Sequence, residues 1–171
     1  GQAFQDCYNL ASITVDSDNK YLDSRNNCNA VVLTADNQLC VGAQNTVIPA
    51  SVTSIRYYAF AGRHNIPEIV IPKSIVSIGY NAFYDCSDTK KVISRIHVPF
   101  DVDEYTFSGI YDYATLYVPQ GTKTDYQSKV GWGKFKTIVE LDENDNPVED
   151  ETEFEAPKLR SEERFSRNAE T

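Results

Sequence analysis

Apolar residues recur along the chain at a fixed offset of 23 positions. The segment 48–60 reads Ile-Pro-Ala-Ser-Val-Thr-Ser-Ile, then three residues, then Ala-Phe. The segment 71–83 reads Ile-Pro-Lys-Ser-Ile-Val-Ser-Ile, then three residues, then Ala-Phe. A unit of this length cannot bury its apolar face alone and must pack against its neighbours. The pattern therefore predicts a repeat solenoid, a fold that usually acts through a broad exposed surface.

Each repeat contains an apolar-x-apolar step, which indicates a short strand with its ends inward and its middle residue outward. These steps lie at 13–15, 46–48, 69–71, 96–98 and 116–118. Proline follows four of them and ends the strand because it removes a backbone donor. The step after Phe83 arrives four residues late, which predicts an insertion near residues 87–94. A Val/Ile-x-x-Ile step then turns the chain around the back of the repeat.

The spacing between Val15 and Ile48 is ten residues longer than one repeat. We expect this excess to form a hairpin, with strands at 30–33 and 39–41 and a polar turn at 35–38. A tight turn at Asp36 and Asn37 would pair Cys40 with Leu33. That register places Cys28 opposite Asn45 and does not join the two cysteines.

The open apolar end of a repeat stack must be covered. After Pro119, Thr122 is placed to cap a short helix over 123–130, which Gly131 would end. Residues 137–141 alternate like a last strand. We expect Trp132 to belong to this cap as a core residue rather than as a ligand platform.

Taken together, the landmarks Leu/Ile-x-x-Ile-x-Ile-Pro-x-x-Val-x-x-Ile-x-x-x-Ala-Phe-x-x-Cys resemble the BspA-like class of leucine-rich repeats, found in surface proteins of gut and oral bacteria. The segments 21–30, 45–49 and 114–140 are similar to segments of those proteins, so the resemblance covers roughly residues 2–141. It implies an α/β-type leucine-rich repeat solenoid with short parallel strands, mostly β and irregular, in a cell-surface or secreted protein. Arg63 departs from the pattern, because the family usually has Cys there.

These boundaries divide the 171 residues into a repeat unit, 1–141, whose cap covers about 119–141, and a tail, 142–171. Because the chain begins inside a repeat, we expect further repeats before it. The net charge is −9, and the tail holds eleven acidic and four basic residues. We expect the tail to be a linker or disordered. An acidic chain without a basic stripe argues against nucleic acid, and no apolar run is long enough to span a membrane.

Catalytic and metal-binding patterns are missing from the sequence. The two histidines, His64 and His97, stand in no zinc-ligand spacing, and no phosphate loop or nucleophile elbow occurs. Asp142, Asn144, Asn146 and Glu153 match the spacing of a calcium loop, but Pro147 stands where the turn requires glycine. We therefore expect no catalytic residues, no metal and no cofactor. Cys7 and Cys86 share a repeat position and are expected to be buried thiols.

The outward positions of the expected strands form the candidate binding surface. The middle residues of the five strands make one row, and the residues one pleat earlier place Glu68 beside Arg95 in a second. The candidate binding residues are Thr14, Val47, Val70, His97, Tyr117, Glu68 and Arg95. A solvated sheet face without a ligand is the alternative for this strip. Eleven tyrosines, mostly in connecting segments, suit either recognition or the covering of repeat junctions.

Three classes of function remain open at this point. The first is a non-catalytic binding or adhesion module of a bacterial surface or secreted protein, which recognises a protein or glycan through the exposed sheet face. The second is a structural spacer that presents another domain. The third is an enzyme, for which the sequence offers no constellation of residues. Neither the ligand nor the oligomeric state follows from the sequence.

Overall fold

The computed structural model describes Phe4 and residues 7–148. Its elements are β1 (Leu22–Asp23), η1 (Arg25–Asn27), β2 (Ala30–Leu33), β3 (Gln38–Gly42), β4 (Ser54–Ile55), β5 (Glu68–Ile71), β6 (Ser77–Ile78), β7 (Lys91–Ser94), β8 (Thr115–Pro119), α1 (Lys123–Ser128), η2 (Trp132–Lys134) and β9 (Thr137–Leu141). The expected strand-rich architecture with parallel pairing is confirmed. The single α-helix of the described residues follows β8 and precedes β9.

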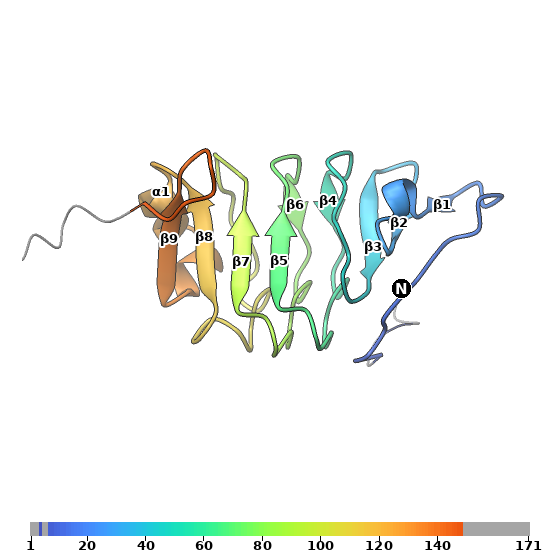
Figure 1. Ribbon diagram of the computed structural model, residues 1–171, viewed down its shortest axis with the longest axis horizontal. Coiled ribbons are helices and arrows are strands. Elements are labelled where there is room, and N and C mark those ends of the chain that lie inside the picture. The colour runs from blue at the N-terminus through green and yellow to red at the C-terminus, as the bar shows by residue number, and fades with distance from the viewer. Residues whose placement is uncertain (1–3, 5–6, 149–171) are drawn as a thin grey trace, which may run out of the picture.

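The front sheet contains β5, β7, β8 and β9 in that order, all parallel (Figure 1). Glu68 pairs with Lys91, so these two strands keep the 23-residue offset. Thr115 and Thr137 continue the same row. Alternate residues of each strand are buried, as in Ile69, Val92, Leu116 and Ile138. A short strand with one buried face therefore recurs in each unit, and its neighbours complete its backbone hydrogen bonds.

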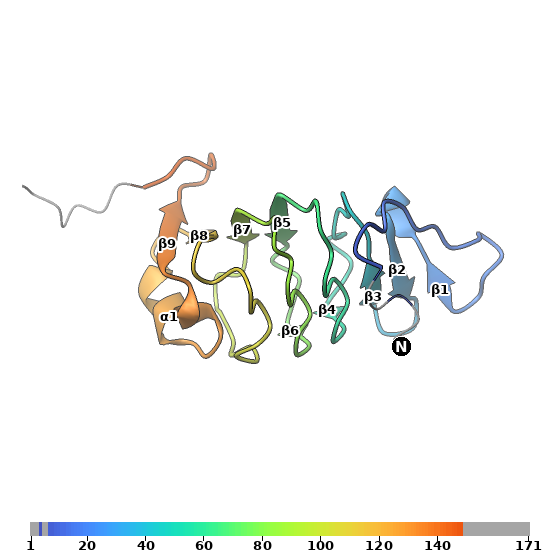
Figure 2. The same cartoon turned by 90° about the horizontal axis from the view of Figure 1, so that it is seen from below.

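The second sheet has the order β1-β2-β3-β4-β6; β6 lies behind β5, and the other strands continue along the long axis beyond the front sheet (Figures 1 and 2). β4 and β6 are the Val/Ile-x-x-Ile steps of successive repeats, and they pair in parallel with Ile55 beside Ile78. The hairpin of β2 and β3 was expected, and β3 joins it to β4. The register differs from the one predicted: Leu33 pairs with Gln38, and a bulge leaves Cys40 as the extra residue. All four cysteines are free thiols.

Stacked aromatic rings run through the core from repeat to repeat. Phe60 lies 5.0 Å from Phe83, and Phe83 lies 5.1 Å from Phe107, measured between ring centroids. The stack ends against Trp132 and Phe135, at 5.1 and 5.3 Å from Phe107. Trp132 is fully buried and donates its Nε1–H to the Phe100 carbonyl at 2.9 Å. The expectation that Trp132 is a core residue is confirmed.

The fourth expected strand, 96–98, was placed wrongly. Residues 96–98 are not a strand; β7 occupies Lys91–Ser94 instead, and no insertion precedes it. Ser94 takes the inward place that Ile71 has in β5, and its hydroxyl lies 2.5 Å from that of Tyr126. Because Ser94 is polar, the alternation of apolar residues that would have indicated β7 is interrupted at this position. Ile96, which is also buried, was mistaken for the strand residue, while Val98 is 83 % exposed.

The first two expected strands are absent as well. Residues 13–15 and 46–48 have no strand pairing. The backbone N–H groups of Ile13 and Val15 donate to side chains, Asn29 Oδ1 and Ser24 Oγ. Side-chain acceptors therefore take the place of a neighbouring strand, and Thr14 is held in an extended but unpaired segment.

The N-terminal segment does not extend the aromatic stack. Phe4 is 38 % exposed, and Cys7, which we expected to be buried like Cys86, is exposed. The reason lies in Arg63, which stands three residues after Phe60, where Cys86 stands after Phe83. The longer Arg63 side chain occupies the buried position that Cys86 occupies in the next repeat.

Arg63 is 1 % exposed and ties this junction together. Its Nε–H donates to the Gly42 carbonyl at 3.0 Å, and its terminal nitrogens donate to the carbonyls of Cys7 at 3.1 Å and Phe4 at 2.9 Å. No carboxylate pairs with it among the described residues. Burial lowers the pKa of Arg63 from its usual value. The hydrogen bonds to backbone carbonyls offset the loss of water around the guanidinium.

The C-terminal helix forms where expected, but its first turn is held differently. α1 begins at Lys123 and ends at Ser128. The Thr122 hydroxyl donates to the Pro119 carbonyl at 2.6 Å and does not cap the helix. Glu140 from β9 accepts the Lys123 N–H instead, at 2.8 Å. β9 pairs with β8 as the expected last strand.

Thiol labelling with an aromatic disulfide reagent tests whether Cys7 is exposed while Cys86 is buried. Cys7 should react in the native protein within minutes, whereas Cys86 should react only on unfolding. Burial raises the pKa of the Cys86 thiol to about 12, so the reactive thiolate is scarce at neutral pH. Equal native reactivity of the two cysteines, followed by peptide mapping, would contradict this arrangement.

Replacing Arg63 tests the junction. Arg63→Leu should lower the free energy of unfolding by about 2–4 kcal/mol, because it removes three hydrogen bonds from the buried guanidinium to the backbone carbonyls of Phe4, Cys7 and Gly42. Urea unfolding followed by circular dichroism measures the change. Arg56→Leu is the matched control, since Arg56 is half-buried and contacts the face of Tyr57; it should cost less than about 1 kcal/mol. An equal effect of both variants would contradict the proposed role of Arg63.

Candidate ligand-binding surface

The outward residues of the front sheet form aligned rows across four strands. The central row is Val70, Ile93, Tyr117 and Val139, each at least partly exposed between buried neighbours. The row one pleat earlier is Glu68, Lys91, Thr115 and Thr137. An apolar strip with a polar border thus crosses the sheet, and this composition is common in the centre and rim of recognition surfaces.

The structure keeps part of the predicted strip. Val70, Tyr117 and Glu68 hold their predicted outward places in the front sheet. Thr14 and Val47 are exposed but lie outside the strands. Their assignment to the ladder was wrong, since both segments lack strand partners.

His97 and Arg95 also lie beyond the strand to which they were assigned. Both follow the end of β7, and Ile93 takes the place predicted for His97. The prediction that Glu68 lies beside Arg95 in the ladder was also wrong: Glu68 pairs with Lys91, with Oε2 and Nζ 4.0 Å apart.

Sequence reasoning missed four members of the rows: Lys91, Ile93, Thr137 and Val139. The signal for the first two was present, because Lys91 and Ile93 lie 23 residues after Glu68 and Val70. Thr137 and Val139 belong to the last strand, which was expected to be a cap and was not aligned with the outward rows.

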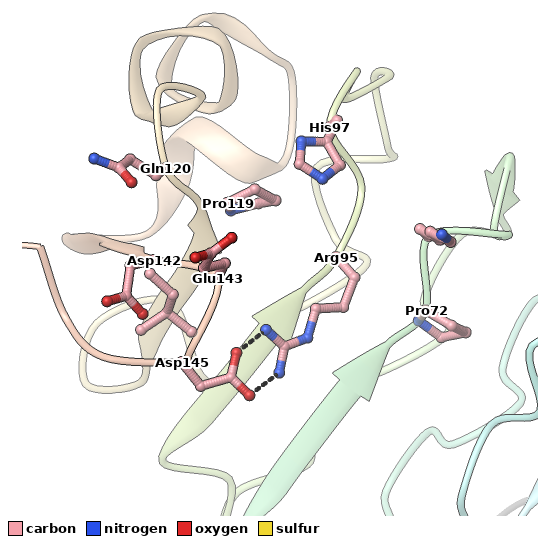
Figure 3. A pocket seen from close by; sticks show the side chains of 10 residues that line it. Pro72, Arg95, His97, Pro119, Gln120, Asp142, Glu143 and Asp145 are labelled. Carbon is pink, nitrogen blue, oxygen red and sulfur yellow. Dashed lines mark hydrogen bonds and ion pairs between the residues drawn. The ribbon is translucent and has the colours of Figure 1, made fainter.

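A hollow of about 520 Å³ lies at the carboxyl ends of the same strands (Figure 3). It continues the surface by one pleat, because Pro72, Arg95 and Pro119 each follow a central-row residue by two positions. Lys73 and His97 add cationic or titratable groups, and the loop after β9 adds Asp142, Glu143 and Asp145. The predicted residues Arg95 and His97 are thus brought together at this edge rather than in the sheet.

The loop after β9 reaches across the hollow to β7. Asp145 accepts two hydrogen bonds from the Arg95 guanidinium, one from each terminal nitrogen, and the NH2–Oδ2 distance is 2.8 Å (Figure 3). The hydrogen bonds from Arg95 lower the pKa of Asp145, and the same bonds raise the pKa of Arg95. Both side chains are substantially exposed, so water screens the attraction and the pair contributes little to stability.

The residues that match a calcium-loop spacing make a turn instead. The Asp142 Oδ1 atom accepts the N–H groups of Asn144 and Asn146, both at 2.8 Å. The bond to Asn146 lowers the pKa of Asp142. Glu153, the last position of the spacing, lies outside the described residues, as do 149–171 of the predicted tail. In the part of the chain that is described, no group of three metal-ligating side chains comes together.

Other expectations have plain outcomes. His64 is half-buried, and its ring stacks on Tyr8 at 5.3 Å between centroids. The expectation that it is a solvated loop residue therefore holds only in part. Among the described residues, the helices are too short and too polar to serve as membrane spans.

Parallel strands at a repeat of 23 residues, with buried Ile, Leu and Val and a turn after each strand, define a leucine-rich repeat protein. A sequence model of the BspA type leucine rich repeat region matches residues 37–138 in six copies. The match covers more than half of the chain, so the chain belongs to the BspA-type leucine-rich repeat family. No curated protein and no solved structure matches it in the comparisons made.

Breaking the contact between the loop and the sheet gives a testable result. Asp145→Asn should change the free energy of unfolding by less than about 1 kcal/mol, because the ion pair is exposed. It should nevertheless speed amide hydrogen exchange at residues 142–146, since the loop loses its attachment to β7. Exchange measured by mass spectrometry checks both statements.

Asp112→Asn is the matched control for this measurement. It removes a second exposed ion pair, Asp112 to Lys136 at 2.9 Å, and Lys136 lies at the opposite end of β9 from the loop. Exchange in the loop should stay unchanged in this variant. Unchanged exchange in Asp145→Asn as well would show that Arg95 does not hold the loop.

Proposed function

We propose that this chain is a non-catalytic binding or adhesion module of a bacterial surface or secreted protein. Its repeats form a solenoid, and the outward face of the front sheet recognises a protein or glycan partner. The family supports this in general terms: BspA-type repeats are commonly found in surface or secreted proteins, and leucine-rich repeats are generally non-catalytic and suit protein interaction.

One observation carries the proposal: the row of Val70, Ile93, Tyr117 and Val139. Four apolar or aromatic side chains lie side by side at the spacing of neighbouring strands, about 4.8 Å. Such cross-strand pairs stabilise the sheet modestly by themselves, and a partner that covers them also removes their apolar area from water. Tyrosine adds a hydroxyl and loses little conformational entropy when it is covered.

The hollow at the edge extends this surface with charge. Lys73, Arg95 and His97 line it together with the carboxylates of the loop after β9. Charged groups beside an apolar strip orient a partner and select against partners of the wrong charge. The proposed surface therefore combines an apolar centre with a charged border.

A double variant tests the proposed surface. Ile93→Ser with Tyr117→Ser should reduce binding at least tenfold to whichever component the wild type captures from an array of matrix proteins and glycans. Truncation of central apolar side chains removes the contacts that dominate most interfaces. Surface plasmon resonance measures the change.

Val76→Ser with Tyr21→Ser is the matched control, because both residues are exposed and lie outside the front sheet. This variant should bind like the wild type. Equal binding by all three proteins would exclude the front sheet as the site. Binding by none of them would favour a structural spacer that presents another domain.

A further inference from the structure

A second hollow, of about 400 Å³, lies at the opposite edge of the repeats, among the loops that lead into the front strands. These loops lie along the lower edge in Figure 1 and face the viewer in Figure 2. Its lining contains four tyrosines, Tyr8, Tyr58, Tyr84 and Tyr105, together with Gly62, Asn81 and Asp85. None of these residues belongs to the front-sheet rows or to the hollow beside Arg95.

The repeat itself creates the space. Tyr58, Asn81 and Tyr105 occupy equivalent positions, each two residues before a phenylalanine of the stack. Neighbouring repeats lie about 4.8 Å apart, so the backbones of the two tyrosines are separated by roughly 10 Å. The short side chain of Asn81 between them leaves a gap with an aromatic residue on each side.

Gly62 also lines the hollow and has no side chain to fill it. Its φ of 66° is one that side chains rarely adopt, and an added Cβ would lie 3.1 Å from the Tyr8 ring. Tyr84 is 44 % exposed and Tyr105 is 55 % exposed, and the Lys134 Nζ atom lies 5.8 Å from the centre of the Tyr105 ring. Aromatic faces are therefore available to a ligand from more than one side.

Tyr58 has a strained backbone. Its φ is 57°, and the equivalent Asn81 has a φ of 54°. Asparagine tolerates this left-handed conformation because its short amide bonds locally, whereas the bulk of tyrosine makes it costly. Asparagine at position 58 would relieve the strain, so tyrosine is held there at an energetic cost. Residues of this kind cluster at ligand sites.

Polar groups lie between the rings. The Asn81 Nδ2 atom donates to the Tyr58 hydroxyl at 3.0 Å, while Oδ1 is buried and has no hydrogen-bond partner. An unpartnered buried amide oxygen is rare in folded proteins. The exposed Asp85 carboxylate lies in the same lining.

A pyranose ring matches these features. Its C–H groups pack on aromatic faces, whose electron-rich surfaces attract them, and its hydroxyls hydrogen-bond to amides and carboxylates. We propose that this hollow binds a neutral sugar ring of a glycan, held between Tyr58 and Tyr105 and hydrogen-bonded by the exposed carboxylate of Asp85.

Tyrosines beside a carboxylate could also enclose a quaternary ammonium group. Such a cage needs rings in close contact around a small cation. Within the described residues, Tyr58, Tyr84 and Tyr105 do not stack on one another, and the hollow is much larger than a trimethylammonium group. The spacing therefore favours a sugar.

The test uses an array of neutral oligosaccharides, followed by calorimetry on any saccharide that binds. The wild type should bind at least one neutral saccharide, and Tyr58→Asn should weaken that binding at least tenfold. The melting temperature of Tyr58→Asn should stay equal or rise, because asparagine relieves the strain. Tyr21→Ala, which removes an exposed tyrosine elsewhere, should bind like the wild type.

Three results would overturn the proposal: no saccharide bound by the wild type, binding unchanged in Tyr58→Asn, or competition by free choline. A fall in the melting temperature together with unchanged binding would assign Tyr58 a purely structural role. The variant carrying Ile93→Ser and Tyr117→Ser separates this site from the front sheet, because it should retain saccharide binding. Loss of saccharide binding in that variant alone would place the sugar on the front sheet instead.

Discussion

The stack of phenylalanine rings sets the spacing on which the rest of the structure depends. Phe60, Phe83 and Phe107 lie 5.0 and 5.1 Å apart with nearly parallel planes, close to the separation of about 4.8 Å between paired strands. Ring stacking inside the core and hydrogen bonding in the front sheet therefore share one repeat distance. Neither can change unless the other is disturbed, so differences in repeat length must be absorbed in the connecting loops.

The paired strands show this directly. Glu68 aligns with Lys91, Lys91 with Thr115 and Thr115 with Thr137, which gives sequence offsets close to 23 that are not identical. Each of the first three strands begins eight residues after its stacked phenylalanine, so the variation lies between the end of a strand and the next phenylalanine. Binding surfaces at the edges can thus differ from repeat to repeat while the buried positions keep their register. The charged hollow beside Arg95 and the tyrosine hollow around Asn81 lie at opposite edges of one regular core.

The sequence predicted the elements whose inward residues are all apolar. Strands β5 and β8, the hairpin, the short helix and the last strand follow from apolar alternation and turn residues. The failures have a common physical cause. Ser94 occupies a buried place because Tyr126 satisfies its hydroxyl from a helix 32 residues away, and no local pattern reveals such a partner. The backbone N–H groups of Ile13 and Val15 donate to the side chains of Asn29 and Ser24. Alternation of apolar residues does not reveal these acceptors either.

The candidate site was predictable in kind but only partly in detail. Val70 and Tyr117 follow from alternation within well-formed strands, whereas His97 was lost when β7 proved to lie earlier. The contact of Arg95 with Asp145 joins residues 50 positions apart through a turn whose shape depends on the Asp142 carboxylate. The tyrosine hollow depends on the gap at Asn81, which appears only when the repeats are stacked in three dimensions.

Arg63 has a consequence for how the chain finds its register. Repeats of nearly identical sequence can pair one unit out of place with little loss of apolar contact, which is a hazard for any repetitive fold. The guanidinium removes this degeneracy at one junction, because only the native alignment offers the carbonyls of Phe4, Cys7 and Gly42 together. A chain shifted by one repeat would enclose the charge without these acceptors. The buried charge of Arg63 thereby fixes the alignment of the chain at this junction.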